Sequence, residues 1–453
     1  MAQTAIIVTL GCPKNQVDSE SMASLLADDG FRLVSEADEA DFIIVNTCGF
    51  IEPARIESIS ELKMLAAGKR DGQKLIAAGC LAELAPTLLM REVPAIDALL
   101  STRRWHEVGS LLRALGGETP APAPSPSGER SELPPYPRRY PLAATAYVKI
   151  AEGCNGPCAF CTIPRIKGPF RSRPQAEIVA EVADLVQRGY KEVILIAQDT
   201  TAYGRDRGDR DALPPLIEAI LAHSPDLPWL RLMYTYPQHI SDRLIAVMAG
   251  NPQVCHYLDL PLQHAHPDVL RRMHRPDDVE AVVALLERVR AAMPDVALRT
   301  AFIVGYPGES EAEFEALLQF VRAVRFDHVG VFAYSREPGT PAHDMEPQID
   351  EKVKLERGER LLQEQQRISR EINQGLVGKE LQVLIEGKGD GISVGRSCRD
   401  APEVDGLAIL TKELQPGQIV PGRVVQAMEY DLLLEPLTGE RGNRRQSRPR
   451  RRP

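Results

Sequence analysis

Short apolar runs alternate with amphipathic stretches along most of the chain. Near the N-terminus, residues 5–10, 41–47 and 74–79 form three apolar runs, and each is followed by a pattern typical of a helix. Fully apolar strands separated by helices indicate a parallel sheet, because both faces of such a sheet are covered. The pattern therefore predicts a parallel α/β domain over residues 1–115.

A segment rich in Pro, Ala and Ser, residues 116–140, follows and predicts a linker that cannot bury a core. Beyond it the alternation of strands and helices becomes more regular. Six strand-like runs begin at Ala146, Glu192, Trp229, His256, Ala297 and His328. Six βα units are two short of a complete eight-stranded barrel. The pattern therefore predicts an open (β/α)6 partial barrel over residues 141–375.

The C-terminal part of the chain has a different pattern. A charged helical stretch over residues 350–374 leads into short alternating runs with Gly and Asp turns, which predict a small antiparallel β-barrel over residues 376–440. Between Gly378 and Leu437 there are 10 acidic and 6 basic residues, a net charge of −4. Residues 441–453 hold seven arginines and no acidic residue. This tail is either a solvated segment or an arm that contacts RNA.

The amino-acid composition indicates which class of protein this is. The 453 residues are 43% hydrophobic and 26% charged, as expected of a soluble globular chain with several domains. No basic region precedes the first apolar run, and no apolar run is long enough for a membrane helix, so we expect a cytoplasmic protein without a membrane partner. Eight unevenly placed cysteines argue against a disulfide scaffold and favour a reducing compartment.

Three of those cysteines, Cys154, Cys158 and Cys161, lie within eight positions, in a turn-rich loop after the first predicted barrel strand. A closed structural zinc site needs four protein ligands, so three thiolates alone leave a metal site open. Three thiolates can also hold an iron–sulfur cluster with one iron free for another ligand. The loop is expected at the C-terminal rim, where barrel enzymes carry out their chemistry. A zinc knuckle completed by a distant histidine is the alternative.

A second set of cysteines is far apart in sequence. Cys12, Cys48 and Cys80 each follow a predicted strand of the N-terminal sheet. The carboxyl ends of parallel strands line one edge of a sheet, so these three side chains are predicted to converge on a second open site. The alternative for each is a small buried hydrophobe. Cys255 and Cys398 lack partners at ligand spacing and are predicted to be packing or surface residues.

The stretch "EGCNGPCAFCTIPRIKG" resembles the cluster loop of the radical S-adenosylmethionine (SAM) superfamily. The two cysteine sites, in this order, resemble the methylthiotransferase family over almost the whole chain, apart from the Pro-rich linker and the Arg-rich tail. The resemblance implies an N-terminal cluster domain, a radical-SAM barrel and a C-terminal TRAM domain. It also implies two 4Fe–4S clusters, one held by Cys12, Cys48 and Cys80, the other, which cleaves SAM, by Cys154, Cys158 and Cys161.

The resemblance also implies a division of labour between two SAM molecules. One methylates a sulfur held on the first cluster, and the other supplies the radical that removes hydrogen from an unreactive substrate carbon. Such a C–H bond offers no acidic proton, so side-chain acids and bases cannot break it and a cofactor must do so. A sulfur donor and an electron donor are therefore expected partners.

Further cofactor contacts are predicted on the barrel rim. By the resemblance, Phe160 packs beside the adenine of SAM, and Gly305 and Pro307, in "AFIVGYPGE", shape the wall around the cofactor. Gln198 and Asp199 end the second barrel strand at the functional rim.

Four other residues are weaker candidates. Tyr234 and Arg299 qualify only by their place on later strands, and each can equally be a structural residue of the barrel lumen. His264 and His266, in "LQHAHPD", suggest a metal ligand pair, but a rim loop whose histidines are satisfied within the protein is the favoured interpretation.

The family divides mainly between enzymes that act on tRNA adenosine and enzymes that act on an aspartate of small-subunit ribosomal protein S-12. Three stretches resemble the second group: "GCPKNQVDSE", "AQDTTAYG" and "GRSCRDAPEVDG". The first has Pro-Lys-Asn where the tRNA enzymes typically have Gln-Met-Asn, and the second has Asp-Thr where they typically have Asn-Val. The acidic C-terminal barrel independently favours a basic protein over a phosphate backbone.

The sequence therefore predicts a radical-SAM methylthiotransferase that modifies the β-carbon of an aspartate in S-12. Its expected partners are S-12 or the small ribosomal subunit, with ribosomal RNA contact through the Arg-rich tail left open. A tRNA adenosine methylthiotransferase is the first alternative. A non-catalytic Fe–S or zinc protein that docks on ribosomes is the second, although purely structural metal sites are normally closed.

Overall fold

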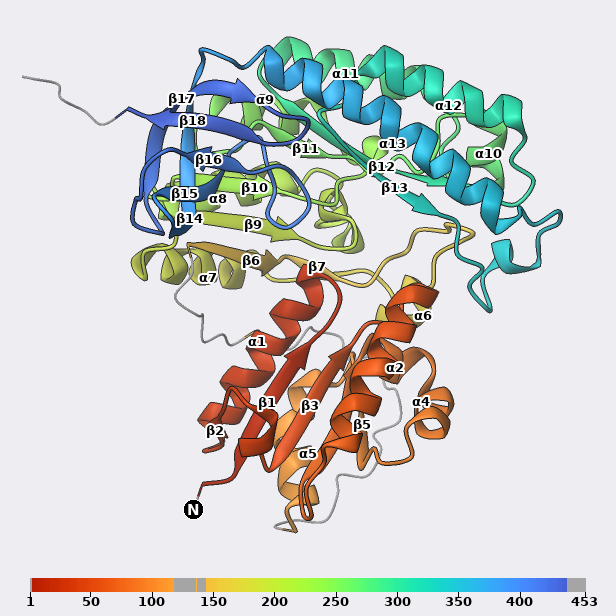
Figure 1. The fold of residues 1–453 in the computed structure, drawn as a ribbon, viewed down its shortest axis with the longest axis vertical. Coiled ribbons are helices and arrows are strands. Elements are labelled where there is room, and N and C mark those ends of the chain that lie inside the picture. Colours follow the sequence, from red (N-terminus) through yellow and green to blue (C-terminus); the bar gives the residue numbers. More distant parts are fainter. Residues whose placement is uncertain (1, 118–135, 137–143, 438–453) are drawn as a thin grey trace, which may run out of the picture. The chain divides into compact units, whose positions relative to one another are not determined.

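The computed structural model describes residues 2–117, 136 and 144–437 (Figure 1). The chain divides into two compact units, Met1–Ile368 and Ser369–Pro453. The first unit contains both the N-terminal sheet and the barrel strands. Most of the predicted Pro-rich linker and all of the Arg-rich tail lie outside the described residues, and the domain limits drawn from the sequence stay a prediction.

The N-terminal residues form a five-stranded parallel sheet with the order β2-β1-β3-β4-β5. The central strand β3 is buried at all six positions, which explains its continuous apolar run. The predicted parallel sheet is confirmed, and β2 and β5 add short strands at its two edges. The strands are β1 Thr4–Thr9, β2 Arg32–Leu33, β3 Phe42–Thr47, β4 Lys74–Gly79 and β5 Ala98–Ser101.

Five α-helices accompany this sheet. Three of them, α1, α2 and α4, begin with a proline in the first turn, where the missing N–H costs nothing. Apolar side chains from α2, α3 and α4 pack against β3 and β4 in one core cluster. The helices are α1 Pro13–Asp28, α2 Glu52–Ala67, α3 Cys80–Leu84, α4 Pro86–Glu92 and α5 Val108–Leu115.

Six further parallel strands follow, in two groups of three ordered β6-β9-β10 and β11-β12-β13. A parallel bridge between Leu230 and Val254 and a 3.0 Å hydrogen bond from the Thr235 N–H to the Asp259 carbonyl join the groups. The strand order follows the sequence, as in the predicted open (β/α)6 partial barrel. The strands are β6 Thr145–Lys149, β9 Glu192–Ile196, β10 Trp229–Leu232, β11 Tyr257–Asp259, β12 Ala297–Val304 and β13 His328–Ala333.

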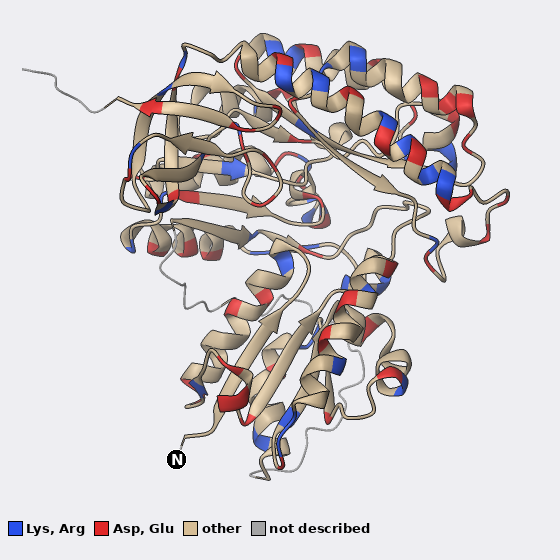
Figure 2. Cartoon of the chain, viewed as in Figure 1, with Lys and Arg blue, Asp and Glu red and all other residues tan. Residues whose placement is uncertain are grey.

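Helices alternate with these strands, and a long charged helix, α13, follows the last one. The predicted capping box of α12 is present, with Ser310 and Glu313 each bonded to the other's backbone N–H. Acidic and basic residues alternate along α13 (Figure 2), and Arg360 pairs with Glu311 of α12 at 2.6 Å. The helices are α7 Gln175–Gln187, α8 Leu213–His223, α9 Asp242–Gly250, α10 Pro267–Arg272, α11 Val279–Ala292, α12 Glu311–Val324 and α13 Glu351–Gln374.

Within the described ranges, none of the helices combines the length and the apolar composition that crossing a membrane requires.

The second unit contains a closed five-stranded barrel with the order β14-β15-β16-β18-β17. The predicted small β-barrel is confirmed. Its pairings are antiparallel except the one between β16 and β18, which is parallel. Its strands are β14 Glu380–Gly389, β15 Ile392–Ser397, β16 Ala408–Leu410, β17 Ile419–Ala427 and β18 Leu432–Pro436.

Candidate functional site

The loop with the three clustered cysteines is closed at its base by a short antiparallel ladder. In this ladder β7, Ala151–Glu152, pairs with β8, Arg171–Ser172. Gly153 follows β7 with φ of +79°, and a Cβ added there would lie 2.1 Å from the carbonyl oxygen of Pro169. Only glycine fits this entry to the loop. The backbone that presents Cys154 is therefore fixed by both a ladder and a close approach.

Every sulfur in this loop accepts a hydrogen bond: Cys154 from the N–H of Gly156 at 3.3 Å, Cys158 from Arg275 at 3.7 Å and Cys161 from the N–H of Ile163 at 3.5 Å. Such donors favour the thiolate form and tune metal-bound sulfur. Burial nevertheless raises the pKa of Cys161 to about 12 and raises that of Cys154 as well. Because a raised pKa favours the protonated thiol, metal binding at Cys154 and Cys161 must displace protons.

The spacing of the sulfurs bears on the choice between zinc and a cluster. Around one zinc ion, Zn–S bonds of about 2.3 Å place tetrahedral sulfurs about 3.8 Å apart. Among the described residues, neither cysteine triad has its three sulfurs within 4.8 Å of one another. A cluster spreads its thiolates over different irons. Gly156 leaves room between two of the sulfurs, since its added Cβ would lie 3.3 Å from Cys154 Sγ and 3.7 Å from Cys158 Sγ. This geometry fits a cluster.

The three N-terminal cysteines lie just beyond the C-terminal ends of three neighbouring strands, β1, β3 and β4. Cys12 lies between β1 and α1, Cys48 directly follows β3, and Cys80 begins α3 directly after β4. The loops that carry them meet: Gly11 has φ of +88°, and a Cβ added there would lie 2.8 Å from Cys48 Cβ. The charges of Cys12 and Cys48 both act on Cys80. The structure places the second triad at one edge of the sheet.

A buried asparagine connects the three loops of this N-terminal triad. The amide group of Asn15 donates to the Leu10 carbonyl at 2.9 Å and to the Thr47 carbonyl at 3.2 Å. Its Oδ1 accepts from Cys80 Sγ at 3.5 Å. Sequence reasoning did not single out Asn15, although it stands three positions after a predicted ligand. Burial raises the pKa of Cys48, and that of Cys80 to about 12.

Four charged side chains form a buried quartet that joins the N-terminal sheet to the barrel. Asp18 of α1 bonds Lys149 at 2.5 Å and Lys167 at 3.0 Å, and Glu152 bonds the same two ammonium groups at 2.7 and 3.2 Å. All four side chains are at most 13% exposed. Burial alone would raise the pKa of Glu152, but the two lysines hold it far below its usual range. The quartet lies beside both triads, since Lys167 acts on Cys80 and Glu152 precedes the Cys154 loop.

Two of the predicted SAM contacts lie next to the cysteine loop. Phe160 packs edge-on against Tyr306, with 6.5 Å between ring centroids. The Gln198 amide nitrogen lies 3.5 Å from Glu152, while its buried Oε1 has no hydrogen-bond partner among the described residues. An orphaned buried acceptor fits a ligand that donates a hydrogen bond there.

The other predicted contacts are engaged within the protein. Asp199 accepts from the Ala202 N–H at 3.0 Å and bonds His239 at 2.8 Å. Gly305 has φ of +69°, and a Cβ added there would lie 2.2 Å from the Lys354 side chain of α13. The backbone at Gly305 therefore packs closely against α13. Pro307 is buried in the same turn.

Tyr234 and Arg299 meet around a buried carboxylate. Arg299 pairs with Asp259 at 3.0 Å, and Asp259 also accepts the Tyr234 N–H at 2.9 Å. Tyr234 has φ of +60°, a strained conformation for a non-glycine residue. Its ring faces Lys14 of α1, whose ammonium lies 3.2 Å from the ring centroid. Burial lowers the pKa of Lys14.

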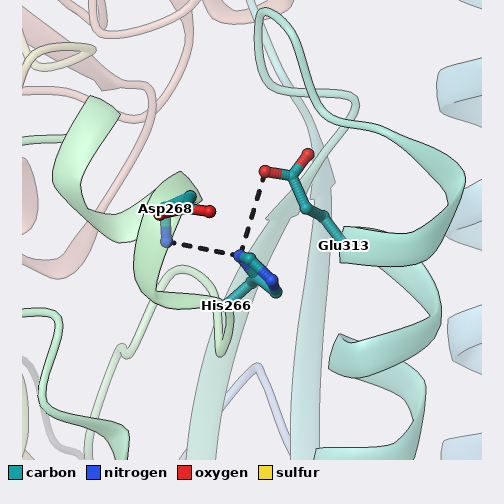
Figure 3. Close-up of side chains that lie close together, drawn as sticks. All are labelled: His266, Asp268 and Glu313. Atoms are coloured by element: carbon teal, nitrogen blue, oxygen red, sulfur yellow. Dashed lines mark hydrogen bonds and ion pairs between the residues drawn. The ribbon is translucent and has the colours of Figure 1, made fainter.

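Three groups lie close enough to hold a metal ion: His266 and Asp268 at the start of α10, and Glu313 of α12 (Figure 3). Both oxygens of Glu313 are already engaged, one by Arg272 at 3.0 Å and the other by Ser310. His266 Nδ1 accepts the N–H of Asp268 at 3.3 Å. These bonds agree with a rim loop whose polar groups are satisfied internally.

One histidine and two cysteines remain among the residues singled out in the sequence. His264 is buried and bonds Glu309 at 3.3 Å, while its Nδ1 accepts the N–H of His266 at 3.0 Å. Of the remaining cysteines, Cys255 is buried and Cys398 is half-buried.

Three family models match successive parts of the chain. Residues 4–101 match "Uncharacterized protein family UPF0004", residues 148–321 match the radical SAM superfamily, and residues 377–436 match the TRAM domain. The first two matches each contain one complete cysteine triad.

Curated relatives are similar over nearly the whole chain. A protein of Roseiflexus sp. (strain RS-1) named "Ribosomal protein uS12 methylthiotransferase RimO" is 49% identical over 451 residues, covering 94% of this chain and 95% of that relative. A protein of Chloroflexus aurantiacus with the same name is 47% identical over 452 residues, covering 95% and 99%.

Among solved structures, the radical S-adenosylmethionine methyltransferase TsrM from Kitasatospora setae matches with a TM-score of 0.57 and 15% identity. The match covers 87% of this chain and 81% of that one. At this identity the likeness concerns the fold alone.

Proposed function

The chain belongs to the family of ribosomal protein uS12 methylthiotransferases named RimO, and we propose that it inserts a methylthio group at the β-carbon of an aspartate of uS12. As a member of this family it is a SAM-dependent enzyme of the radical SAM superfamily. One observation carries the proposal: two open cysteine triads lie at the ends of parallel strands within one compact unit.

We assign one 4Fe–4S cluster to each triad. Cys154, Cys158 and Cys161 would hold the cluster that cleaves SAM, and Cys12, Cys48 and Cys80 would hold a second cluster that carries the sulfur to be transferred. Together, clusters and SAM supply the radical and the methylthio group. The protein's own part is to donate hydrogen bonds to sulfur, to exclude water and to fix the two sites relative to each other through the buried quartet.

SAM is proposed to bind among Phe160, Gln198, Asp199, Gly305 and Pro307. The orphaned Gln198 Oε1 supports this placement most directly, because it lacks a partner beside the cysteine loop. Asp199 is proposed to support the rim of the SAM site through its bond to His239. Gly305 and Pro307 are proposed to shape the wall of the site through their backbone.

The domain limits are proposed as 1–115 for the first cluster domain, 116–140 for the linker, 141–375 for the barrel, 376–440 for the TRAM domain and 441–453 for the tail. An electron donor and a sulfur donor complete the reaction, and the tail is proposed to contact ribosomal RNA. We propose that the activity takes place in the cytoplasm, because its proposed substrate is a ribosomal protein.

The test is mass spectrometry of ribosomal proteins and of digested tRNA from cells with and without the enzyme. A gain of one methylthio group on an aspartate of uS12 that depends on the enzyme supports the proposal. Unmodified uS12 together with an enzyme-dependent methylthio-adenosine in tRNA would contradict the substrate and favour the tRNA activity. Modification of neither would favour a non-catalytic role, which anaerobic reconstitution and a SAM cleavage assay would then examine.

A further inference from the structure

Among the described residues, the Lys14 ammonium has no anion within ion-pair distance. Lys14 stands in the first turn of α1, two residues after Cys12. Its side chain contacts the ring of Tyr234 across the barrel rim, at 3.2 Å from ammonium to centroid. Within the described part of the chain, its ammonium takes part in no hydrogen bond or ion pair, although the side chain is half-buried.

The position is unfavourable for a lysine in three ways. The N-terminus of a helix carries partial positive charge, which repels a cation. Partial burial of the side chain removes some of the water around the ammonium. The like charge of Lys149 also lowers the pKa of Lys14, whereas Cys12, Asp259 and Glu152 act in the opposite direction. A helix position that breaks a local rule is a candidate for a functional role.

The anions near Lys14 are already paired with other cations. Asp259 is fully buried and bonds Arg299 at 3.0 Å. Glu152 belongs to the buried quartet, where two lysines neutralise it. The aromatic face of Tyr234 attracts the ammonium but leaves its three N–H groups available to an acceptor. The structure thus presents a cation that lacks an anion, between the N-terminal triad and the barrel rim.

We infer that Lys14 binds the side-chain carboxylate of the substrate aspartate, an assignment that rests on the proposed function. The carbon to be modified is bonded directly to that carboxylate, so a hydrogen-bonded ion pair there fixes the reacting C–H bond. Lys14 is placed for this role because it lies beside Cys12 on one side and beside Tyr234 of the barrel on the other.

The rival explanation is that Lys14 balances the negative charge of sulfur at the N-terminal triad. The two explanations predict different effects of removing the Lys14 charge. A substrate-binding cation affects discrimination between aspartate and asparagine in uS12, whereas a cluster counter-ion affects iron content or the spectrum of the N-terminal cluster.

The experiment is a double-mutant cycle with the full-length, anaerobically reconstituted enzyme. Binding of uS12 is compared with binding of a uS12 variant that has asparagine at the modified position. The enzymes are wild type, Lys14→Met, which keeps most of the side-chain length but not the charge, Lys14→Arg, which keeps the charge, and Lys63→Met. Lys63 pairs with Glu92 on the surface and serves as the matched control.

We expect wild type and Lys63→Met to prefer aspartate over asparagine by about tenfold to a hundredfold, the range of a charged hydrogen bond. Lys14→Met should bind both forms equally and transfer no methylthio group, with unchanged iron content and SAM cleavage. Lys14→Arg should keep part of the preference.

An unchanged aspartate preference in Lys14→Met overturns the inference while leaving the proposed function intact. Loss of iron or an altered cluster spectrum in that variant overturns it in favour of the counter-ion role. If wild type neither binds nor modifies uS12, the proposed function fails, and the inference fails with it.

Discussion

Asp18 and Lys149 form a buried ion pair, with 2.5 Å between Oδ1 and Nζ, although 131 residues separate them in sequence. Asp18 comes from α1 of the N-terminal sheet and Lys149 from β6 of the barrel. Lys167 and Glu152 complete the quartet, so two positive and two negative groups balance each other. The two cysteine triads are thus held in one compact unit partly by charges that cannot be removed singly without leaving another unpaired.

Lys149→Met tests this relationship. The substitution leaves two buried carboxylates against one ammonium, and we expect it to lower the free energy of unfolding of the first unit by about 3–5 kcal/mol. Methylthio transfer should fall more than SAM cleavage, because only transfer requires both sites. Chemical denaturation and the two product assays measure these effects. Lys63→Met, at an exposed pair, should change stability by less than about 0.5 kcal/mol. Equal stability of the two variants would show that the quartet does not stabilise the unit.

The strands, helices and domain order could be predicted because each element has its own local pattern of apolar and polar residues. Strand β3 begins with four apolar residues and is buried at all six positions, and the barrel strands repeat such apolar runs between helices. The N-terminal triad was predicted because each of its cysteines follows such a strand, and topology then determines where it lies. The barrel triad was visible directly, because its three cysteines lie within eight positions of the sequence. Strand β2 has two exposed residues and no apolar pattern, so nothing in the sequence marked it.

The polar contacts could not be predicted in the same way. Asp18, Lys149 and Lys167 are ordinary surface residues by composition, and only tertiary contacts over more than 100 positions bury them. Lys14 was visible in a family motif, but its lack of a partner appears only in three dimensions. The contacts of Tyr136 could not be predicted either, because it lies in the Pro-rich stretch of the sequence. In the structure it is buried, stacks on Trp105 with 5.1 Å between ring centroids and donates a hydrogen bond to Glu152.

Replacing any one barrel cysteine tests the SAM-cleaving site. We expect Cys154→Ala, Cys158→Ala or Cys161→Ala to abolish reductive cleavage of SAM, because each removes one of three thiolates in an already open site. The measurement is 5′-deoxyadenosine formation under anaerobic reducing conditions. Cys255→Ala, at a buried cysteine outside both triads, is the control and should retain cleavage. Near-normal product from any one of the three barrel variants would contradict the assignment.

The N-terminal triad should be separable from the barrel. We expect the combined replacement of Cys12, Cys48 and Cys80 by alanine to remove about half of the bound iron and all methylthio transfer. Radical formation at the barrel should largely persist, since its own three cysteines remain. Iron and sulfide analysis together with the 5′-deoxyadenosine assay decide the matter. If the triple variant keeps the iron content of the wild type, there is no second cluster.

The C-terminal barrel is predicted to dock on a basic protein surface. Residues 378–437 carry 10 acidic and 6 basic residues, so this module has little charge with which to release counterions from a phosphate backbone. Deletion of residues 378–453 should therefore abolish modification of uS12 in ribosomes while leaving SAM cleavage intact. Deletion of residues 441–453 alone removes seven arginines and should at most weaken ribosome binding, because the protein-docking barrel remains. Modification by both truncated enzymes is measured by mass spectrometry of ribosomal proteins. Full modification by the longer deletion would contradict docking through this barrel, and loss of SAM cleavage would show that the two units do not act separately.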